Sequence, residues 1–292
     1  MSEATDMSTN QSLAFPDYVG RSERASGAIL APPLELMAAV LNHRLDDMAP
    51  GGAVPPLWHW MFLQKPVLQS GIGPDGHPKR GGLIPPIPYP RRMFAGSRTR
   101  FIAPLHIGDE IERTLTIKSI TPKSGRSGNL VFVTLTTEIH GPRGLSLSED
   151  QDLVYREAPK DSGKPVPPAP PPVDRGQPQG FAVVETVHPD PVLLFRFSAA
   201  TGNSHRIHYD ADYVRNEEGY PGLVVHGPLQ AVLLADLARR FLGRPLANFE
   251  FRAMKPTFVD RPLYCVANGE GGKATVQTMD LVHDVCMSAT AQ

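Results

Sequence analysis

A short segment of the chain places polar side chains at spacings that suit acid–base chemistry. Residues 197–210 read FSAATGNSHRIHYD, so Asn203 precedes His208 by five positions. A second segment, GLVVHGP at 222–228, leads through Gly227 into apolar residues of helical periodicity at 229–241. An imidazole beside the backbone N–H groups of a helix start suits proton transfer and charge stabilisation next to a thioester carbonyl.

Three residues of these two segments differ in the chemistry that they can perform. His208 titrates near neutral pH, so it can take a proton from water and give it back. Asn203 cannot be a general base, because a carboxamide does not titrate usefully, but it can fix a water molecule by hydrogen bonding. The N–H group of Gly227, at the helix start, can hold a developing oxyanion. We therefore expect His208, Asn203 and Gly227 to be the catalytic group.

Neighbouring polar residues are expected to contact the substrate. His205 and His226 either touch it or orient the loop by hydrogen bonding. Arg91 and Arg92, with Arg98, form a basic cluster that is either a solvated surface or a contact for coenzyme A phosphates or a substrate carboxylate. The full set of expected substrate contacts is His205, Arg206, Tyr209, Val225, His226, Arg91 and Arg92.

Two other motifs have simpler structural interpretations. Asp75-Gly76 predicts a turn. The aromatic run at 58–62 predicts core or interface packing, with an acyl pocket as the alternative.

Composition excludes several classes of function. The 292 residues are 41% hydrophobic, with 29 basic and 30 acidic side chains, so no overall charge attracts nucleic acid or an anionic membrane. Apolar stretches fall short of the roughly 20 residues that a membrane helix needs. Cys265 and Cys286 are expected to be packed thiols, and no HExxH or CxxC pattern is present, so we expect no metal and no cofactor. The polar residues 1–12 lack a signal sequence, which favours the cytoplasm.

A proline-rich segment divides the chain. Residues 158–179 read APKDSGKPVPPAPPPVDRGQPQ, a composition that favours an extended linker over a helix or strand. We therefore predict an N-terminal domain at 13–157, a linker at 158–179 and a C-terminal domain at 180–292.

Each half has the same inventory of elements. Helices are predicted at 32–43 and 227–241, the second one stopped by Gly243. Strands are predicted at 111–118 and 129–139, which form a hairpin, and at 248–252, 263–267, 274–279 and 282–289. The fold class is therefore α+β, with an antiparallel sheet curved around a central helix in each half.

The polar segment resembles a known motif. Residues 202–208 are similar to the G-D-x-N-P-x-H motif of the MaoC-like hydratase/dehydratase superfamily, with Asn203 in place of aspartate and His205-Arg206 in place of Asn-Pro. The runs HRIHYD and PGLVVHGP are closer to one branch, the mesaconyl-CoA (3-methylfumaryl-CoA) hydratases and type 2 hydroxyacyl-thioester dehydratases. The runs GPDGHP at 73–78 and PRRM at 90–93 are also similar to that branch.

This resemblance implies a tandem (double) hotdog fold with one active site where the halves meet. It implies reversible hydration of a 2-enoyl-CoA thioester, such as 3-methylfumaryl-CoA to citramalyl-CoA. Three alternatives stay open: a 3-hydroxyacyl-thioester dehydratase that uses acyl carrier protein, a non-catalytic acyl-CoA-binding hotdog protein, and a thioesterase. A homodimer is a further expectation.

Overall fold

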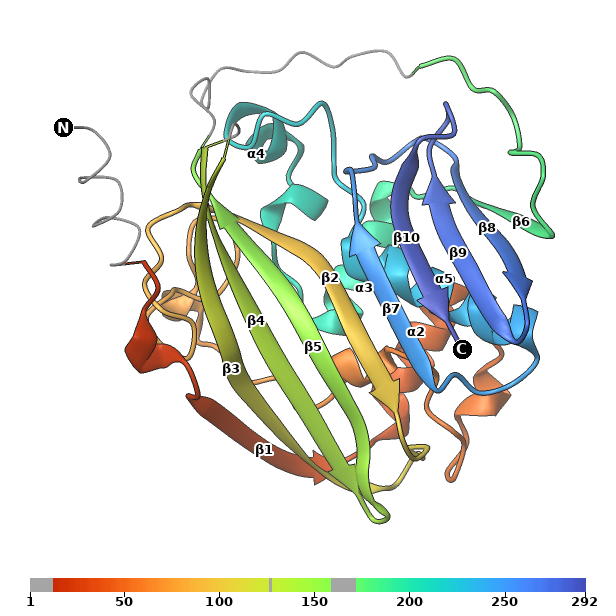
Figure 1. Cartoon of the computed structure of the whole chain (residues 1–292), viewed down its shortest axis with the longest axis horizontal. Coiled ribbons are helices and arrows are strands. Elements are labelled where there is room, and N and C mark those ends of the chain that lie inside the picture. The colour runs from red at the N-terminus through yellow and green to blue at the C-terminus, as the bar shows by residue number, and fades with distance from the viewer. Residues whose placement is uncertain (1–12, 126–127, 159–171) are drawn as a thin grey trace.

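The computed structural model describes residues 13–125, 128–158 and 172–292. Within them, ten strands form one antiparallel sheet in the order β1-β3-β4-β5-β2-β7-β10-β9-β8-β6 (Figure 1). The strands are β1 Ser22–Ala28, β2 Arg91–Phe101, β3 Glu110–Gly125, β4 Gly128–Gly141, β5 Gly144–Arg156, β6 Val183–Val187, β7 Asn248–Ala253, β8 Leu263–Glu270, β9 Lys273–Met279 and β10 Val285–Ala291.

Four α-helices lie in the described residues. They are α2 Ala31–Leu41, α3 Pro191–Thr201, α4 Ala211–Asn216 and α5 Gly227–Leu242. Short 3-10 turns occupy Pro16–Tyr18, Leu45–Met48, Trp58–Met61, Gln69–Gly71 and Arg206–His208. None of the described helices is long and apolar enough to cross a membrane.

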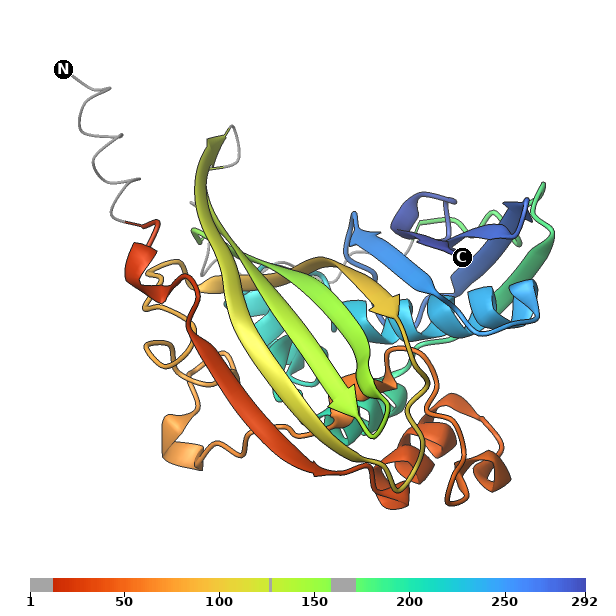
Figure 2. The ribbon, with the colours of Figure 1, turned by 60° about the horizontal axis from the view of Figure 1, so that its bottom comes forward.

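The C-terminal sheet covers α5, as predicted. Leu229, Val232 and Leu237 are buried on this helix, which packs along β8, β9 and β10 (Figures 1 and 2). The helix ends at Gly243, whose φ of 64° is the left-handed conformation that glycine adopts without strain.

In the N-terminal half, the predicted hairpin and helix are confirmed. The hairpin is β3–β4, and burial alternates along β4 because successive side chains of a strand point to opposite faces. The helix α2 is short and lies against α3 of the other half. The helix α3 itself was not predicted; Asp190 caps it by accepting a hydrogen bond from the N–H of Leu193 at 2.6 Å.

The predicted domain boundaries stay predictions. Most of the predicted linker lies outside the described residues. Its last part, from residue 172, is described and packs on the C-terminal half, where the N–H of Arg175 donates to Leu281 O at 3.0 Å. His283 Nε2 is likewise 2.9 Å from Gly176 O.

The two halves are joined edge to edge through β2 and β7. Residues 96–100 pair with residues 248–252, and this pairing makes the two sheets continuous. Trp60 packs against Phe94 and Phe251, with ring centroids 5.7 and 6.3 Å away, so the predicted packing role of the aromatic run is confirmed for this residue.

A buried carboxylate holds Trp60 in place. The Trp60 indole donates to Glu149 Oε2 at 2.9 Å, and His59 and Ser97 also hydrogen-bond to Glu149. Burial alone raises the pKa of Glu149, but the bonds from His59, Ser97 and Trp60 outweigh it and lower the pKa. Glu149 therefore keeps its negative charge although it is buried, and both of its carboxylate oxygens accept hydrogen bonds.

Gly96 permits the close approach of β2 and β7. A Cβ atom there would lie 2.4 Å from the carbonyl oxygen of Phe251. We expect Gly96→Ala to lower the free energy of unfolding by about 1–3 kcal/mol, because the strands have to separate. Chemical denaturation measures this, with Gly82→Ala as the control, since a Cβ at Gly82 meets nothing within 4 Å. Equal stability of the two variants would contradict a tight joint.

Candidate active site

The loop that carries Asn203 begins where α3 ends. Gly202, with φ 62°, terminates α3 and turns the chain outward. The N–H of Asn203 then donates to Ser198 O at 2.9 Å, and Asn203 Oδ1 accepts the N–H of His205 at 3.1 Å. The amide oxygen is thus used to shape the loop, and its Nδ2 group is the part left to meet a ligand.

His208 is fixed as a neutral base. Its Nδ1 lies 2.7 Å from Val224 O, and since a carbonyl only accepts, the proton is on Nδ1 and Nε2 is bare. Burial lowers the pKa of His208 to about 4, against the opposing effect of the Val224 bond, and the charge of His77 lowers it further. The ring is therefore unprotonated at neutral pH.

His226 supports His208 from one face. The two rings stack with centroids 3.5 Å apart and planes 18° apart. His226 is completely buried, its Nε2 is 2.8 Å from Ser198 Oγ, and burial lowers its pKa well below 6.5. Because it is also the N-cap residue of α5, it places the start of that helix next to His208.

Gly227 is the first residue of α5. The N–H groups in the first turn of a helix have no partner within the helix and carry its positive dipole end. A Cβ at Gly227 would lie 3.7 Å from Phe94, so the start of this helix faces Phe94, which packs against Trp60 and Phe251.

A turn from the N-terminal half docks onto this loop. Asp75 O accepts the N–H of Arg206 at 2.9 Å, Pro74 O accepts Arg206 Nη1 at 3.0 Å, and Gly76 O accepts the hydroxyl of Ser204. Gly76 has φ 91°, and a Cβ there would lie 1.8 Å from Ser204 O. The predicted Asp75-Gly76 turn is therefore present, and only glycine fits at its tip.

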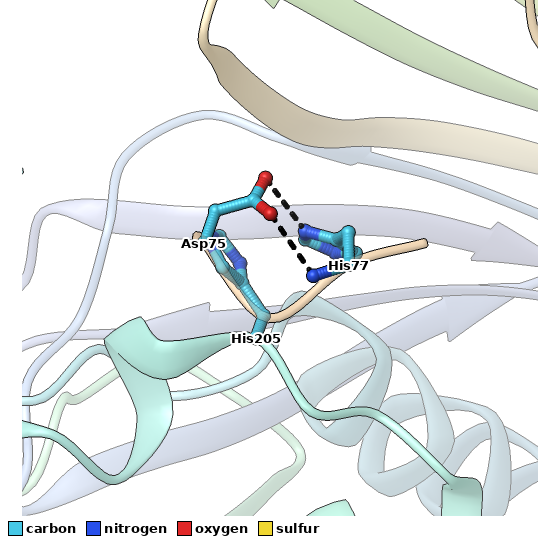
Figure 3. A group of neighbouring side chains, drawn as sticks. All are labelled: Asp75, His77 and His205. Carbon is cyan, nitrogen blue, oxygen red and sulfur yellow. Dashed lines mark hydrogen bonds and ion pairs between the residues drawn. The ribbon is translucent and has the colours of Figure 1, made fainter. Parts of the chain in front are cut away.

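This turn brings Asp75 and His77 to His205 (Figure 3). Asp75 Oδ2 lies 3.3 Å from His77 Nδ1, Asp75 Oδ1 accepts the N–H of His77 at 3.0 Å, and the rings of His77 and His205 are 4.2 Å apart. Neither Asp75 nor His77 was predicted from the sequence to be part of a site. The available signal was an imidazole two residues beyond a turn aspartate.

The protonation states of this group follow from burial and charge. Burial raises the pKa of Asp75, but the hydrogen bonds from His77 outweigh it and hold the pKa at about 2. Burial and the nearby histidines lower the pKa of His205 to about 2, and burial lowers that of His77. One ligand atom from each residue lies within 4.8 Å of the others, a donor set that zinc also takes.

Arg91 and Arg92 differ in their surroundings. Arg91 is buried, donates to Glu217 O at 3.0 Å and lies 3.4 Å from a carboxylate oxygen of Glu218, so its charge is used within the protein. Arg92 makes no ion pair with a carboxylate of the described residues, and its charge lowers the pKa values of His77 and His205. Its charge therefore acts on both imidazoles and is not neutralised by an ion pair within the described residues.

The remaining expected contacts mainly hold the loop. Arg206 pairs with Asp210 at 2.7 Å, and the Tyr209 hydroxyl donates to Ser204 O at 3.1 Å. Val225 is buried and its N–H donates to Thr257 O at 2.9 Å. Their contact with a substrate stays a prediction.

Comparison with known proteins gives consistent matches. The family model for hydroxyacyl-thioester dehydratase type 2 matches residues 57–259. A mesaconyl-C(4)-CoA hydratase of Chloroflexus aurantiacus is 47% identical over 94% of this chain and 96% of its own. A mitochondrial hydroxyacyl-thioester dehydratase type 2 of Schizosaccharomyces pombe is 26% identical over 81% of this chain and 83% of its own.

Solved structures confirm the predicted tandem hotdog fold. A MaoC-like dehydratase from Phytophthora capsici superposes with a TM-score of 0.66 at 13% identity, over 93% of this chain and 95% of its own. A Mycobacterium tuberculosis protein described as a double hotdog gives a TM-score of 0.58 at 13% identity, over 94% of this chain and 95% of its own.

We expect His208 to titrate near pH 4. An unfolded imidazole takes a proton near pH 6.5, so His208 contributes stability above that pH and this stability is lost as pH falls from 6.5 toward 4. The loss from this residue is on the order of 3 kcal/mol. Proton NMR of the imidazole gives the pKa, and denaturation of wild type and His208→Gln gives the linkage. A His208 pKa of 6 or above would contradict its burial as a neutral base.

Proposed function

Because this chain belongs to the hydroxyacyl-thioester dehydratase type 2 family and is a hydro-lyase, we propose that it reversibly hydrates a short, branched or dicarboxylic 2-enoyl-CoA. The candidate substrate is 3-methylfumaryl-CoA (mesaconyl-CoA), hydrated to citramalyl-CoA, because the Chloroflexus relative bears that substrate's name. The observation that carries the proposal is the neutral His208, with Nε2 bare, beside the first turn of α5.

In the proposed mechanism, His208 activates the water. Its Nε2 takes a proton from water as the oxygen adds to C3, and the electrons of the double bond move to the thioester oxygen. The Gly227 N–H, at the positive end of α5, stabilises that oxygen. The proton on His208 then passes to C2, so one group serves both proton transfers and no net charge is left behind.

Asn203 is proposed to position the water. Since its Oδ1 accepts the His205 N–H, its Nδ2 group would donate to the water oxygen while the water donates to His208. An amide at this position adds no second base. It also adds no negative charge that would raise the pKa of His208.

Arg92 is proposed to bind the free carboxylate of a dicarboxylic substrate. In 3-methylfumaryl-CoA this carboxylate is attached to C3, the carbon that receives water, so it lies on the His208 side of the substrate. A guanidinium whose charge acts on the imidazoles of His77 and His205 suits that role.

The second candidate function is a 3-hydroxyacyl-thioester dehydratase acting on acyl carrier protein. The match to the type 2 hydroxyacyl-thioester dehydratase family model favours the dehydratase chemistry of this candidate, as does the Schizosaccharomyces pombe relative. Incubation with crotonyl-CoA, 3-methylfumaryl-CoA and crotonyl-acyl carrier protein separates the candidates by mass: addition of water identifies the preferred carrier and acyl group. Release of free CoA would instead identify a thioesterase, and no change in any thioester would indicate a binding protein.

We expect His208→Ala to lower the hydration rate by about a hundred- to ten-thousandfold, because the proton carrier is lost. Asn203→Ala should lower it less, since it removes only the positioning of water. Steady-state kinetics of folded variants on the best thioester measures both effects. An unchanged rate in His208→Ala would remove this residue from the mechanism.

Removal of the Arg92 charge should affect only substrates with a free carboxylate. For Arg92→Gln we expect KM for 3-methylfumaryl-CoA to rise about tenfold or more, because a charge-assisted hydrogen bond is lost, with little change for crotonyl-CoA. Arg100→Gln, an exposed arginine on the same strand, is the matched control. A similar loss with both thioesters would assign Arg92 to coenzyme A instead.

A further inference from the structure

We propose that His77, held by Asp75, forms with Arg92 the receptor for the free carboxylate of a dicarboxylic acyl-CoA, and that His77 takes up a proton when this carboxylate binds. The inference rests on the proposed function and deepens it, because it assigns the substrate class to a specificity site. That site comes from the N-terminal half of the chain, whereas His208 comes from the C-terminal half.

The docked turn fixes the positions of Asp75 and His77. Three hydrogen bonds join Pro74, Asp75 and Gly76 to the loop that carries His205. The His77 ring lies 4.2 Å from that of His205, which in turn lies 5.6 Å from that of His208. His77 is therefore linked to His208 through one imidazole, that of His205.

Asp75 and His77 are also more exposed to solvent than His208. The side chains of His77 and Asp75 are 17% and 19% exposed, whereas His208 is 5% exposed and His226 is fully buried. An acyl group whose C3 lies against His208 could thus direct its carboxylate toward His77.

The charges around His77 favour an anion over a metal cation. Three charged groups act on it, Asp75 and Arg80 from its own segment and Arg92 from β2, while His205 and His208 lie on the docked loop. Both histidines are neutral, so two positive charges face a single carboxylate. Asp75 Oδ2 is moreover already engaged with His77 Nδ1, 3.3 Å away.

The tautomer of His77 explains why a proton has to enter. Asp75 accepts the Nδ1 proton, so Nε2 is bare in the free protein and cannot donate to a carboxylate. Burial, with Arg92 and Arg80, keeps the pKa of His77 below 6.5. A bound carboxylate adds negative charge, which raises that pKa; Nε2 then takes one proton from solvent, and its N–H donates a hydrogen bond to the carboxylate.

This coupling gives a pH dependence with a definite sign. Between the pKa of His77 in the free protein, below 6.5, and its higher pKa in the complex, binding is tighter at lower pH. Affinity should fall by up to about tenfold for each pH unit as pH rises through that window. A monocarboxylic thioester has no carboxylate to bind, so its affinity should not follow this pattern.

Isothermal titration calorimetry with unreactive saturated thioesters tests the proposal without turnover. At pH 7, in two buffers of different ionisation enthalpy, methylsuccinyl-CoA should bind with uptake of up to one proton and butyryl-CoA with none. His77→Gln should abolish the uptake and weaken methylsuccinyl-CoA binding by about ten- to a hundredfold. Butyryl-CoA binding should be unchanged.

Two further variants separate a specific role from a structural one. Asp75→Asn keeps an acceptor for the turn but removes the negative charge, so it should reduce proton uptake and spare butyryl-CoA. His106→Gln removes another histidine beside an aspartate, Asp109, 3.7 Å away, beyond the far end of β2, and should behave as wild type. Normal proton uptake in His77→Gln, or equal weakening of both thioesters, would overturn the proposal.

Two controls complete the design. Binding that requires zinc, or is lost with a chelator, would assign the three residues to a metal and also overturn the proposal. Failure of the proposed hydratase function is a separate result: selective, proton-coupled binding of methylsuccinyl-CoA without hydration of any enoyl-CoA would leave the receptor intact.

Discussion

The hydrogen bond from His208 Nδ1 to Val224 O determines what this site can do. It fixes the tautomer and leaves Nε2 without a proton, while burial lowers the pKa and keeps the imidazole neutral, with the ring of His226 stacked on one face. Val224 can serve as acceptor because its own N–H donates to Ile207 O at 3.0 Å and the strand-like segment around it pairs with Phe258. The proposed base thus depends on backbone geometry more than on a neighbouring charge.

That geometry in turn depends on contact between the halves. The sheet is continuous through β2 and β7, and the Pro74–His77 turn docks onto the loop that precedes His208. Trp60, which is hydrogen-bonded to the buried Glu149, packs against Phe251 of β7. Each half therefore supplies part of the surface that the other half needs in order to place its polar side chains.

Sequence analysis predicted the features whose signals are local. The apolar stripe of α5 and the glycine after it defined that helix, and the β-branched run of β4 defined the hairpin. The helix α3 was not predicted because its apolar residues are not confined to one face. Val192 and Phe195 are 62% exposed, whereas Leu194 and Phe197 are buried. Asp75 and His77 were not predicted as site residues because they reach His205 only through tertiary contact. Ser204 and Gly76, which form one of these contacts, are 128 positions apart in the sequence.

Covalent fusion of two hotdog modules removes a symmetry constraint. In a dimer of identical modules, every substitution appears at two equivalent places, so a side chain that improves one pocket also alters its copy. Here Asn203 and His208 occur in one module, and Asp75 and Arg92 in the other. Each module can therefore change independently, and the proposed catalytic residues can be kept while the residues proposed to contact the acyl group change.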